Sequence, residues 1–191
     1  MADKFSQTLA ALCNAHKERM RDVVQLTMLN LFSQCVDMSP VGNPDIWKAN
    51  AGAMAARDAY REEAFTYNAQ NPGKKRKGTG RVTVSKKFPL SAGKGYTGGR
   101  FKNNWQVGIA AINPKIEDAA DGSGSAAMAR ARAALITFQI GHQIFIGNNL
   151  PYAKRLEFGW SKQAPSGMIR LSIQNTQRAL SDAIAATKGR G

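Results

Sequence analysis

The longest periodic pattern in this chain covers residues 3–37 and predicts one continuous amphipathic helix of about ten turns. Asp3 or Ser6 supplies an N-cap, and Ser39-Pro40 ends the helix because the residue before a proline disfavours helical geometry. Apolar or small side chains recur every three or four positions and form one stripe: Phe5, Leu9, Leu12, His16, Met20, Val23, Thr27 and Leu31. Such a stripe requires a cover, so the rest of the chain must supply a sheet or another helix that packs on it.

The remaining patterns predict an α+β fold in which a small, mainly antiparallel sheet is packed by this N-terminal helix and by a C-terminal helix. Period-two alternation over 81–85 and the run 105–112 predict a β-ribbon, and 138–146 predicts a further strand. Helices are expected over 45–69, with a break near Gly52, over 126–137 and over 167–187, and Pro151 starts a short helical turn. At 191 residues the chain fits a single domain, 1–191, in which residues 44–94 form a long basic insertion: a helical part, then a basic loop and the β-ribbon.

The formal net charge is +14, and one segment carries most of the excess. Residues 71–105 hold ten Lys or Arg and no Asp or Glu, whereas residues 1–70 are nearly balanced. Such a block attracts phosphate groups through counterion release without selecting a base sequence. A solvated loop that faces an acidic protein partner explains it equally well. The residues expected to contact DNA or an acidic partner are Lys74, Lys75, Arg76, Lys77, Lys86 and Lys87.

The chain has no apolar run near the 18 or so residues that span a membrane, and its N-terminus has no basic stretch followed by an apolar core. The sequence therefore predicts a soluble protein without a secretory signal, assembled in a cytoplasm. Cys13 and Cys35 lie in the same predicted helix, about 33 Å apart and beyond disulfide reach, so both are expected to be reduced thiols.

One glycine pattern resembles a nucleotide-binding motif, but its context rejects that interpretation. Gly93–Gly98 fits the dinucleotide fingerprint, and Asp118 lies twenty residues beyond it. The fingerprint needs a buried strand before it and a helix after it, whereas Phe88-Pro89 precedes it here and a strand containing Gly108 follows. No cofactor is therefore expected.

Metal-binding and catalytic patterns are equally weak. Cys13 and His16 are three residues apart on a helix, but no second pair with ligand spacing exists, and His142 stands alone in a strand. Both histidines are better interpreted as structural. The chain contains no nucleophile elbow, paired-carboxylate motif or His-containing triad signature, so the sequence argues against an enzyme and predicts no metal site.

Three segments, in order along the chain, carry the most specific pattern. The first is Ser39-Pro-Val-Gly-Asn-Pro44; the second, Gly95–Trp105, ends in Arg-Phe-Lys-Asn-Asn-Trp; the third, Gly147–Arg170, contains Pro-Tyr-Ala-Lys-Arg-Leu-Glu-Phe-Gly. These signature segments resemble neck or tail-completion proteins of long-tailed bacteriophages, in which comparable segments follow a long first helix, enter the first strand and precede the last helix. The resemblance covers residues 1–42 and 95–187, and the interval of about 50 residues between the first two segments is longer than in many relatives.

The resemblance implies a structural virion protein that forms a homo-oligomeric, hexameric ring in the neck, completes the tail and joins it to the head. Its implied partners are other copies of itself, the head–tail connector, and tail terminator or tail tube proteins, with DNA in the channel as a further contact and no membrane. A tail terminator is a close alternative. The interface residues that the resemblance implies are Pro40, Asn43, Tyr96, Arg100, Trp105, Tyr152, Leu156, Glu157 and Trp160.

Some of these assignments have a second interpretation. Glu157 lies near Arg155 and Arg170, so it fits either an ion pair with a neighbouring subunit or an ordinary local salt bridge or helix cap. Trp105 and Trp160 fit the protein core as well as an interface. For the whole chain, a non-sequence-specific nucleic-acid-binding protein is the alternative from a different class, although aromatic residues are not interleaved through the Lys/Arg tract as single-strand binding favours.

Overall fold

The computed structural model describes residues 2–73, 81–92 and 97–188, and the chain divides into two compact units. Unit 1 consists of Met1–Val41 and Gly98–Gly191, and unit 2 consists of Gly42–Thr97. The sequence predicted one domain with an insertion over 44–94, and unit 2 nearly coincides with that insertion. The insertion is therefore a compact unit of its own. The α+β fold class is confirmed, with a long N-terminal helix and a small antiparallel sheet.

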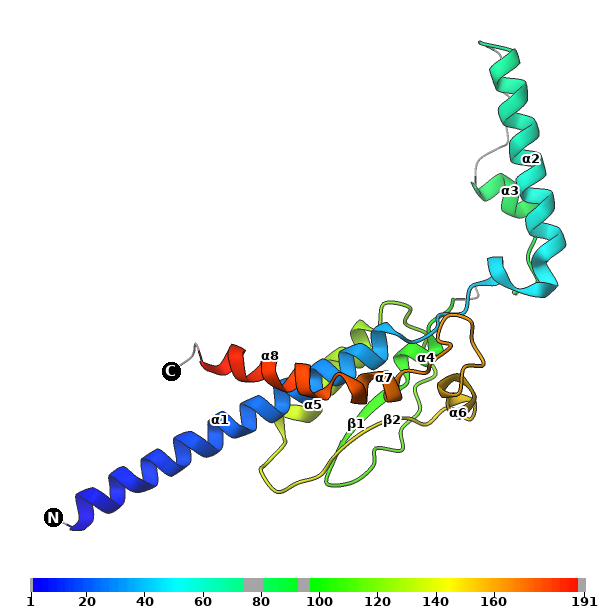
Figure 1. The fold of residues 1–191 in the computed structure, drawn as a ribbon. Coiled ribbons are helices and arrows are strands. Elements are labelled where there is room, and N and C mark those ends of the chain that lie inside the picture. The colour runs from blue at the N-terminus through cyan, green and yellow to red at the C-terminus, as the bar shows by residue number, and fades with distance from the viewer. Residues whose placement is uncertain (1, 74–80, 93–96, 189–191) are drawn as a thin grey trace. The chain divides into compact units, whose positions relative to one another are not determined.

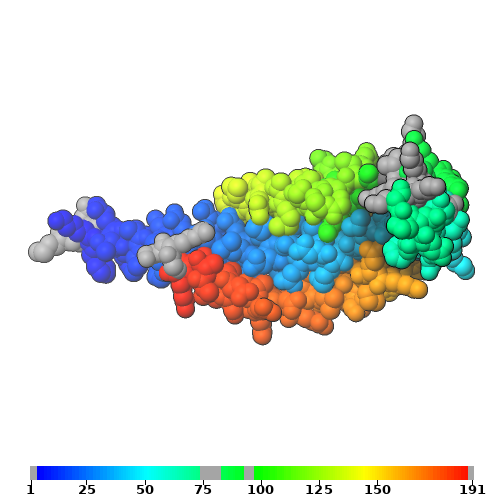
Figure 2. Space-filling model, turned by 90° about the horizontal axis from the view of Figure 1, so that it is seen from above, coloured from blue at the N-terminus to red at the C-terminus, as the bar shows by residue number. Residues whose placement is uncertain are grey.

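The long helix α1 (Ala2–Asp37) organises unit 1. It packs against α8 (Thr176–Lys188) on one side and against α5 (Ser125–Ile136) on the other, and α8 runs antiparallel to it (Figure 1). Figure 2 shows α1 between these two helices, with its N-terminal end extending beyond both. The buried line of α8 consists of Ala179, Ala183 and Thr187, small side chains that allow a close approach of the two helices. Helices on two sides thus cover the C-terminal half of α1, whereas the predicted cover is missing along residues 4–20, which are exposed.

The sheet has two antiparallel strands in the described part of the chain, β1 (Trp105–Ile109) and β2 (Ile144–Asn148), with Val107 opposite Ile146. The short helix α4 (Arg100–Asn103) leads into β1, and α6 (Ala153–Glu157) follows β2. Both strands are shorter than predicted. β1 ends before Ala110, whose φ of 61° is left-handed and interrupts the extended backbone. The residues before β2 form turns.

The hydrophobic core of unit 1 lies where α1, α5 and β1 meet. It is built from the C-terminal half of α1, from one face of α5 and from the segments that flank the two strands. Its buried members are Phe32, Cys35, Val36, Phe101, Trp105, Val107, Ala127, Ala131, Leu135, Leu150, Ala164 and Met168.

The predicted C-terminal helix over 167–187 is divided into α7 (Ile169–Gln174) and α8. The division falls at Asn175, whose backbone N–H bonds to the carbonyls of Leu171 and Ser172. The Asn175 side chain donates to Gln34 Oε1 on α1 at 3.0 Å, so the junction is fastened to the long helix. A tertiary contact therefore decides where the last helix turns.

Unit 2 begins with two short 3₁₀ helices, η1 (Pro44–Ile46) and η2 (Lys48–Asn50), followed by α2 (Ala51–Gln70). The helix predicted over 45–69 is therefore continuous only from Ala51. The buried side chain of Asn50 explains the interruption, because it donates to Pro44 O at 2.9 Å and accepts from Ser91 N at 2.8 Å. These hydrogen bonds stabilise the two 3₁₀ turns, so a regular α-helix does not form there.

The predicted β-ribbon is wrong in its first strand, because residues 81–87 form a helix, α3 (Arg81–Lys87). Val84 is fully buried, and Phe88 at the end of α3 packs edge-on against Tyr60 of α2 with ring centroids 5.9 Å apart. Arg57 also donates from Nε to Phe88 O at 2.9 Å. Packing against α2 thus outweighs the strand preference of the Val-Thr-Val run.

Candidate assembly interface

The first two signature segments meet at Trp105, the first residue of β1. Its side chain is 1% exposed, and its indole Nε1 donates to Ser39 Oγ at 2.6 Å. The Ser39 hydroxyl in turn donates to Cys35 O at 2.7 Å, at the end of α1. Phe101 packs edge-on against the indole ring, with centroids 5.8 Å apart. The end of the long helix is thereby tied to the start of the sheet.

The third signature segment joins the same cluster. The Asn148 side chain donates to Phe101 O at 2.9 Å, and the ring of Tyr152 lies 6.0 Å from the ring of Phe101. Leu150 is buried in the core beside them. The three segments therefore form one structural site, although its first and last residues are more than a hundred positions apart in the sequence. We call this site the signature cluster, and it consists of Ser39, Phe101, Trp105, Asn148 and Tyr152.

Asn104 fixes the loop that follows β1. The side chain is fully buried and uses both of its polar groups. Nδ2 donates to Arg100 O at 2.7 Å and to Glu117 O at 2.8 Å, while Oδ1 accepts from Glu117 N at 2.7 Å. A buried amide with all these partners is specific for Asn, because an Asp or Leu would leave buried backbone groups unpaired. The sequence pattern contained Asn104, but its role in fixing the loop was not predicted.

Glu157 caps the start of α7. Its carboxylate accepts backbone N–H donors from Met168 at 2.8 Å, Ile169 at 3.0 Å and Arg170 at 3.1 Å. The Arg170 Nε lies 3.5 Å from the same carboxylate, and its Nη2 donates to Glu157 O at 2.6 Å. This geometry matches the local helix cap that the sequence left open for Glu157.

The environment of Glu157 keeps the carboxyl group ionised. Burial raises its pKa, but the backbone N–H donors of Met168, Arg170 and Ile169 and the Arg170 guanidinium outweigh burial and hold that pKa below its usual range. The backbone at position 167 lies so close to the Glu157 carboxylate that this residue must be glycine. Its φ is +78°, and a Cβ there would stand 2.6 Å from Glu157 Oε1. The connection between α6 and α7 is consequently a rigid turn.

An aromatic edge lies beside this turn and faces solvent. Trp160 is 75% exposed, Phe158 is 66% exposed and Tyr152 is 39% exposed. The guanidinium of Arg155 lies 5.6 Å from the Trp160 ring centroid, and that of Arg170 lies 5.0 Å from the Phe158 ring centroid. These cation–π contacts hold the side chains in place, so the aromatic edge is presented in a fixed arrangement. Phe158 was not predicted, although it stands in the quoted Leu-Glu-Phe-Gly sequence.

The other predicted interface residues of unit 1 divide between the core and the surface. Trp105 is a core residue and not a surface contact, because the Ser39 hydroxyl and the Phe101 ring enclose it. Leu156 is half-buried against the core and Pro40 is half-buried. Arg100 is exposed and pairs with Asp118 at 3.2 Å. Tyr96 lies outside the described residues.

The predicted residues of unit 2 have local roles in the described part of that unit. The Asn43 side chain accepts from Asp45 N at 3.0 Å and caps η1. Lys86 is exposed, and the Lys87 ammonium lies 4.1 Å from the Tyr60 ring centroid. The predicted contacts Lys74, Lys75, Arg76 and Lys77 lie outside the described residues.

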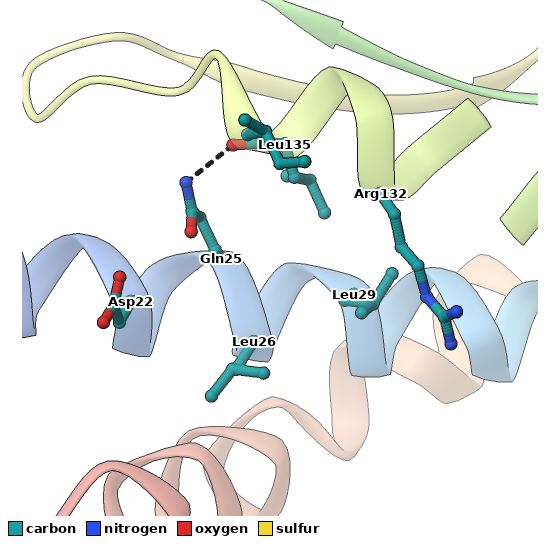
Figure 3. Close-up of a pocket in the computed structure, with 7 residues that line it drawn as sticks. Asp22, Gln25, Leu26, Leu29, Arg132 and Leu135 are labelled. Atoms are coloured by element: carbon teal, nitrogen blue, oxygen red, sulfur yellow. Dashed lines mark hydrogen bonds between the residues drawn. The ribbon is translucent and has the colours of Figure 1, made fainter. Parts of the chain in front are cut away.

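A separate open pocket of about 310 Å³ lies between α1 and α5 (Figure 3). Leu26, Leu29, Leu135 and Ile136 line it, and the Gln25 side chain donates to Leu135 O at 2.7 Å across its mouth. Asp22 and Arg132 complete the rim. The lining is mainly aliphatic and carries no clustered nucleophile or base, so the pocket offers no evident chemistry.

The two cysteines differ in environment. Cys13 is an exposed free thiol on the N-terminal half of α1, whereas Cys35 is a buried free thiol whose Sγ lies 3.2 Å from Ser172 Oγ. Burial raises the pKa of the Cys35 thiol to about 11, against a smaller lowering by the Ser172 hydrogen bond. Cys35 therefore remains a protonated thiol in the core.

Residues 2–73, 81–92 and 97–188 contain no group of three or more His, Cys, Asp or Glu side chains placed to hold a metal ion. They also contain no helix that is both long and apolar enough to span a bilayer. Comparisons with protein-family models, curated proteins and solved structures find no match to this chain.

Proposed function

We propose that this chain is a structural virion protein of a long-tailed bacteriophage, which forms a ring in the neck, completes the tail and joins it to the head. The observation that carries the proposal is the convergence of the three signature segments in the signature cluster. Ser39, Trp105 and Tyr152 come from different segments, yet they are connected through the Trp105–Ser39 hydrogen bond and the contacts of the Phe101 ring with Trp105 and Tyr152. A shared sequence pattern of this kind is expected where distant segments build one common architecture.

The surface beside the signature cluster supports an assembly role. Trp160 and Phe158 project into solvent next to the capped turn, and large exposed aromatic side chains are typical anchors of protein–protein interfaces. The Glu157 cap makes the turn rigid, so little conformational entropy is lost when a partner binds it. We assign the aromatic edge to contact with a neighbouring subunit or an adjacent ring of the tail.

Mass measurement of the purified chain tests the ring directly. The proposal expects a species of six times the 20.7 kDa chain mass, either alone or after tail proteins are added. A chain that stays monomeric under both conditions contradicts the proposal.

An extract that contains filled heads and tails but lacks this protein tests the joining activity. Purified protein is added and joined particles are counted. Phe158→Ser is expected to abolish most joining, whereas Ile112→Ser, which removes an equally exposed side chain elsewhere in unit 1, should leave it intact. Equal joining by the two variants removes the aromatic edge from the proposal, and no joining by the unmodified protein contradicts the proposal as a whole.

The charge of the chain favours nucleic-acid binding as the second candidate. Residues 71–105 carry ten Lys or Arg and no acidic residue, and Lys86 is exposed. Replacement of Lys74, Lys75, Arg76 and Lys77 by Ser tests this candidate. If these cations contact DNA, four neutralised phosphates give a slope of roughly −3.6 in log affinity against log salt, and the variant loses most of it. DNA binding that is independent of salt and unchanged in the variant contradicts this candidate.

A further inference from the structure

Residues 4–20 form the exposed N-terminal part of α1, which we call the arm. Every residue of the arm is exposed, whereas burial begins further along the same helix and is complete at Thr27 and Phe32. Figure 2 shows the arm as the blue end of α1, beyond α5 and α8. A helical segment of this length is marginally stable in water, so a free arm gains stability from any helix that packs on it.

The arm carries an apolar face that is larger than solvent exposure favours. Phe5 is 71% exposed, Leu9 49%, Leu12 56% and Met20 59%, and their spacing places them on one stripe. Further along α1, the same face contains Thr27, which is buried, and Leu31, which is half-buried. This is also the face on which α8 packs, since Gln34, one turn beyond Leu31, accepts a hydrogen bond from Asn175 at the start of α8.

The apolar stripe of α1 therefore extends beyond the part of the helix that α8 covers. In the body of unit 1, α8 covers the face; along the arm, the face is open. The chain cannot cover it by folding the arm back, because the arm and the packed half belong to one unbroken helix. A partner from another molecule can run along the arm as α8 runs along the body.

The absence of charge on the arm fits a second copy of this chain as the partner. Residues 5–16 contain no Lys, Arg, Asp or Glu, although the chain as a whole carries a net charge of +14. The positions that flank the stripe are small and uncharged: Ser6, Thr8, Cys13 and Ala15. Two copies of so basic a protein repel one another over most of their surface, but two arms can approach along this seam without like-charge contacts.

We infer that the arm pairs with the arm of a second copy of this chain, apolar stripe against apolar stripe. The contact is a helix pair in which Leu9 and Leu12 form the centre and the small flanking residues permit close approach. Pairing of this kind is independent of the neck assignment, because any self-associating form of the chain can use it. The arm then becomes a stable helix when two chains associate, and it loses that stability when they separate.

Self-association of two double variants tests the arm pairing. Leu9→Gln/Leu12→Gln removes the centre of the stripe, and Ala10→Gln/Ala11→Gln places the same helix-forming residue on the opposite face of the arm. All four positions are exposed in the single chain, so neither variant should disturb its fold. Sedimentation is expected to show an increase of at least about a hundredfold in the dissociation constant for the first variant and little change for the second.

Cross-linking at Cys13 adds a measurement of position. Cys13 lies one residue from the midpoint of the arm, so paired arms bring it beside its counterpart whether they run parallel or antiparallel. A short bis-maleimide should therefore join two chains in the associated protein, and Cys13→Ser should abolish the product, because Cys35 is buried and does not compete.

The outcomes separate this inference from the proposed function. A ring that persists unchanged in Leu9→Gln/Leu12→Gln, or a chain that is monomeric at every concentration, overturns the arm pairing. An associated chain in which Cys13 gives no cross-link also overturns it. Arm-dependent association without joining of heads to tails leaves the arm pairing in place and counts against the neck assignment alone.

Discussion

The two halves of α1 share one periodic pattern and differ in what surrounds them. Phe5 and Thr27 lie on the same stripe of the helix, yet Phe5 is 71% exposed and Thr27 is buried. Local sequence is sufficient to define the helix in both halves, because the spacing of apolar residues continues without interruption. Burial, in contrast, depends on whether another element reaches the face. The comparison shows that an apolar stripe identifies a surface that needs a partner, and does not by itself place that surface in the core.

The largest expected effect is that of Phe32→Ala in the packed half. Loss of a fully buried ring leaves a cavity in the hydrophobic core of unit 1, so the free energy of unfolding should fall by roughly 3–5 kcal/mol. Urea unfolding followed by fluorescence measures the change. A loss below about 1 kcal/mol would mean that the two halves of α1 do not differ in packing as described.

The next effect concerns the link between α1 and the sheet. Trp105→Phe removes the Nε1 donor and leaves the buried Ser39 hydroxyl without its indole partner, so we expect a loss of about 1–3 kcal/mol. Trp160→Phe is the matched control, because Trp160 is 75% exposed, and its effect should stay within about 0.5 kcal/mol. Equal effects of the two variants in the same unfolding experiment would refute the enclosed position of Trp105.

A smaller, pH-dependent effect is expected for Glu157→Gln. The substitution weakens three backbone hydrogen bonds to the cap and should cost about 1–2 kcal/mol at pH 7. The native pKa of Glu157 is depressed, so the stabilisation is fully present above the unfolded value of about 4.3 and is lost as pH falls through the lower native value. Thermal unfolding of both proteins between pH 7 and pH 2.5 should show the difference shrinking at the acid end. A difference that grows towards low pH has the wrong sign for this cap.

The smallest effect is expected for Phe5→Ala in the arm. The side chain packs on no core in the single chain, so the free energy of unfolding should change by less than about 0.5 kcal/mol. Hydrogen exchange sharpens the same comparison: backbone amides of residues 5–16 should exchange much faster in dilute protein than those of residues 28–36. Slow exchange in both halves of a monomeric sample would remove the distinction.

Much of unit 1 could be predicted because its signals are local. The extent of α1, the entry of β1 at Trp105 and the helical turn after Pro151 all follow from periodicity, capping and proline chemistry. Two residues of the signature cluster, Trp105 and Tyr152, were named from the sequence, and the other three stand within the signature segments. The Trp105–Ser39 bond was not predicted, since nothing in either segment specifies a contact across 66 positions. For the same reason, the sequence alone favoured the local salt bridge or cap for Glu157 but left the intersubunit pair open.

Unit 2 shows where local patterns fail. The Val-Thr-Val run has strand preference, but the segment forms α3, in which Val84 is buried and after which Phe88 packs against Tyr60 of α2. Likewise, the two 3₁₀ turns before α2 depend on Asn50 and Ser91, which are far apart in the sequence. Contacts of this kind carry the information that periodicity lacks.

The unbroken course of α1 gives the protein a mechanical property. Once a partner orders the arm, the helix is stiff over its whole length, and from residue 22 to residue 2 it extends about 30 Å beyond the packed half. Tilting the packed half by roughly 5° within the core would therefore move the tip sideways by about 3 Å, nearly the width of a methyl group. A partner that binds the tip and displaces it therefore also displaces Phe32 and Val36 in the core. A force applied at the far end of α1 is transmitted to its junction with the sheet.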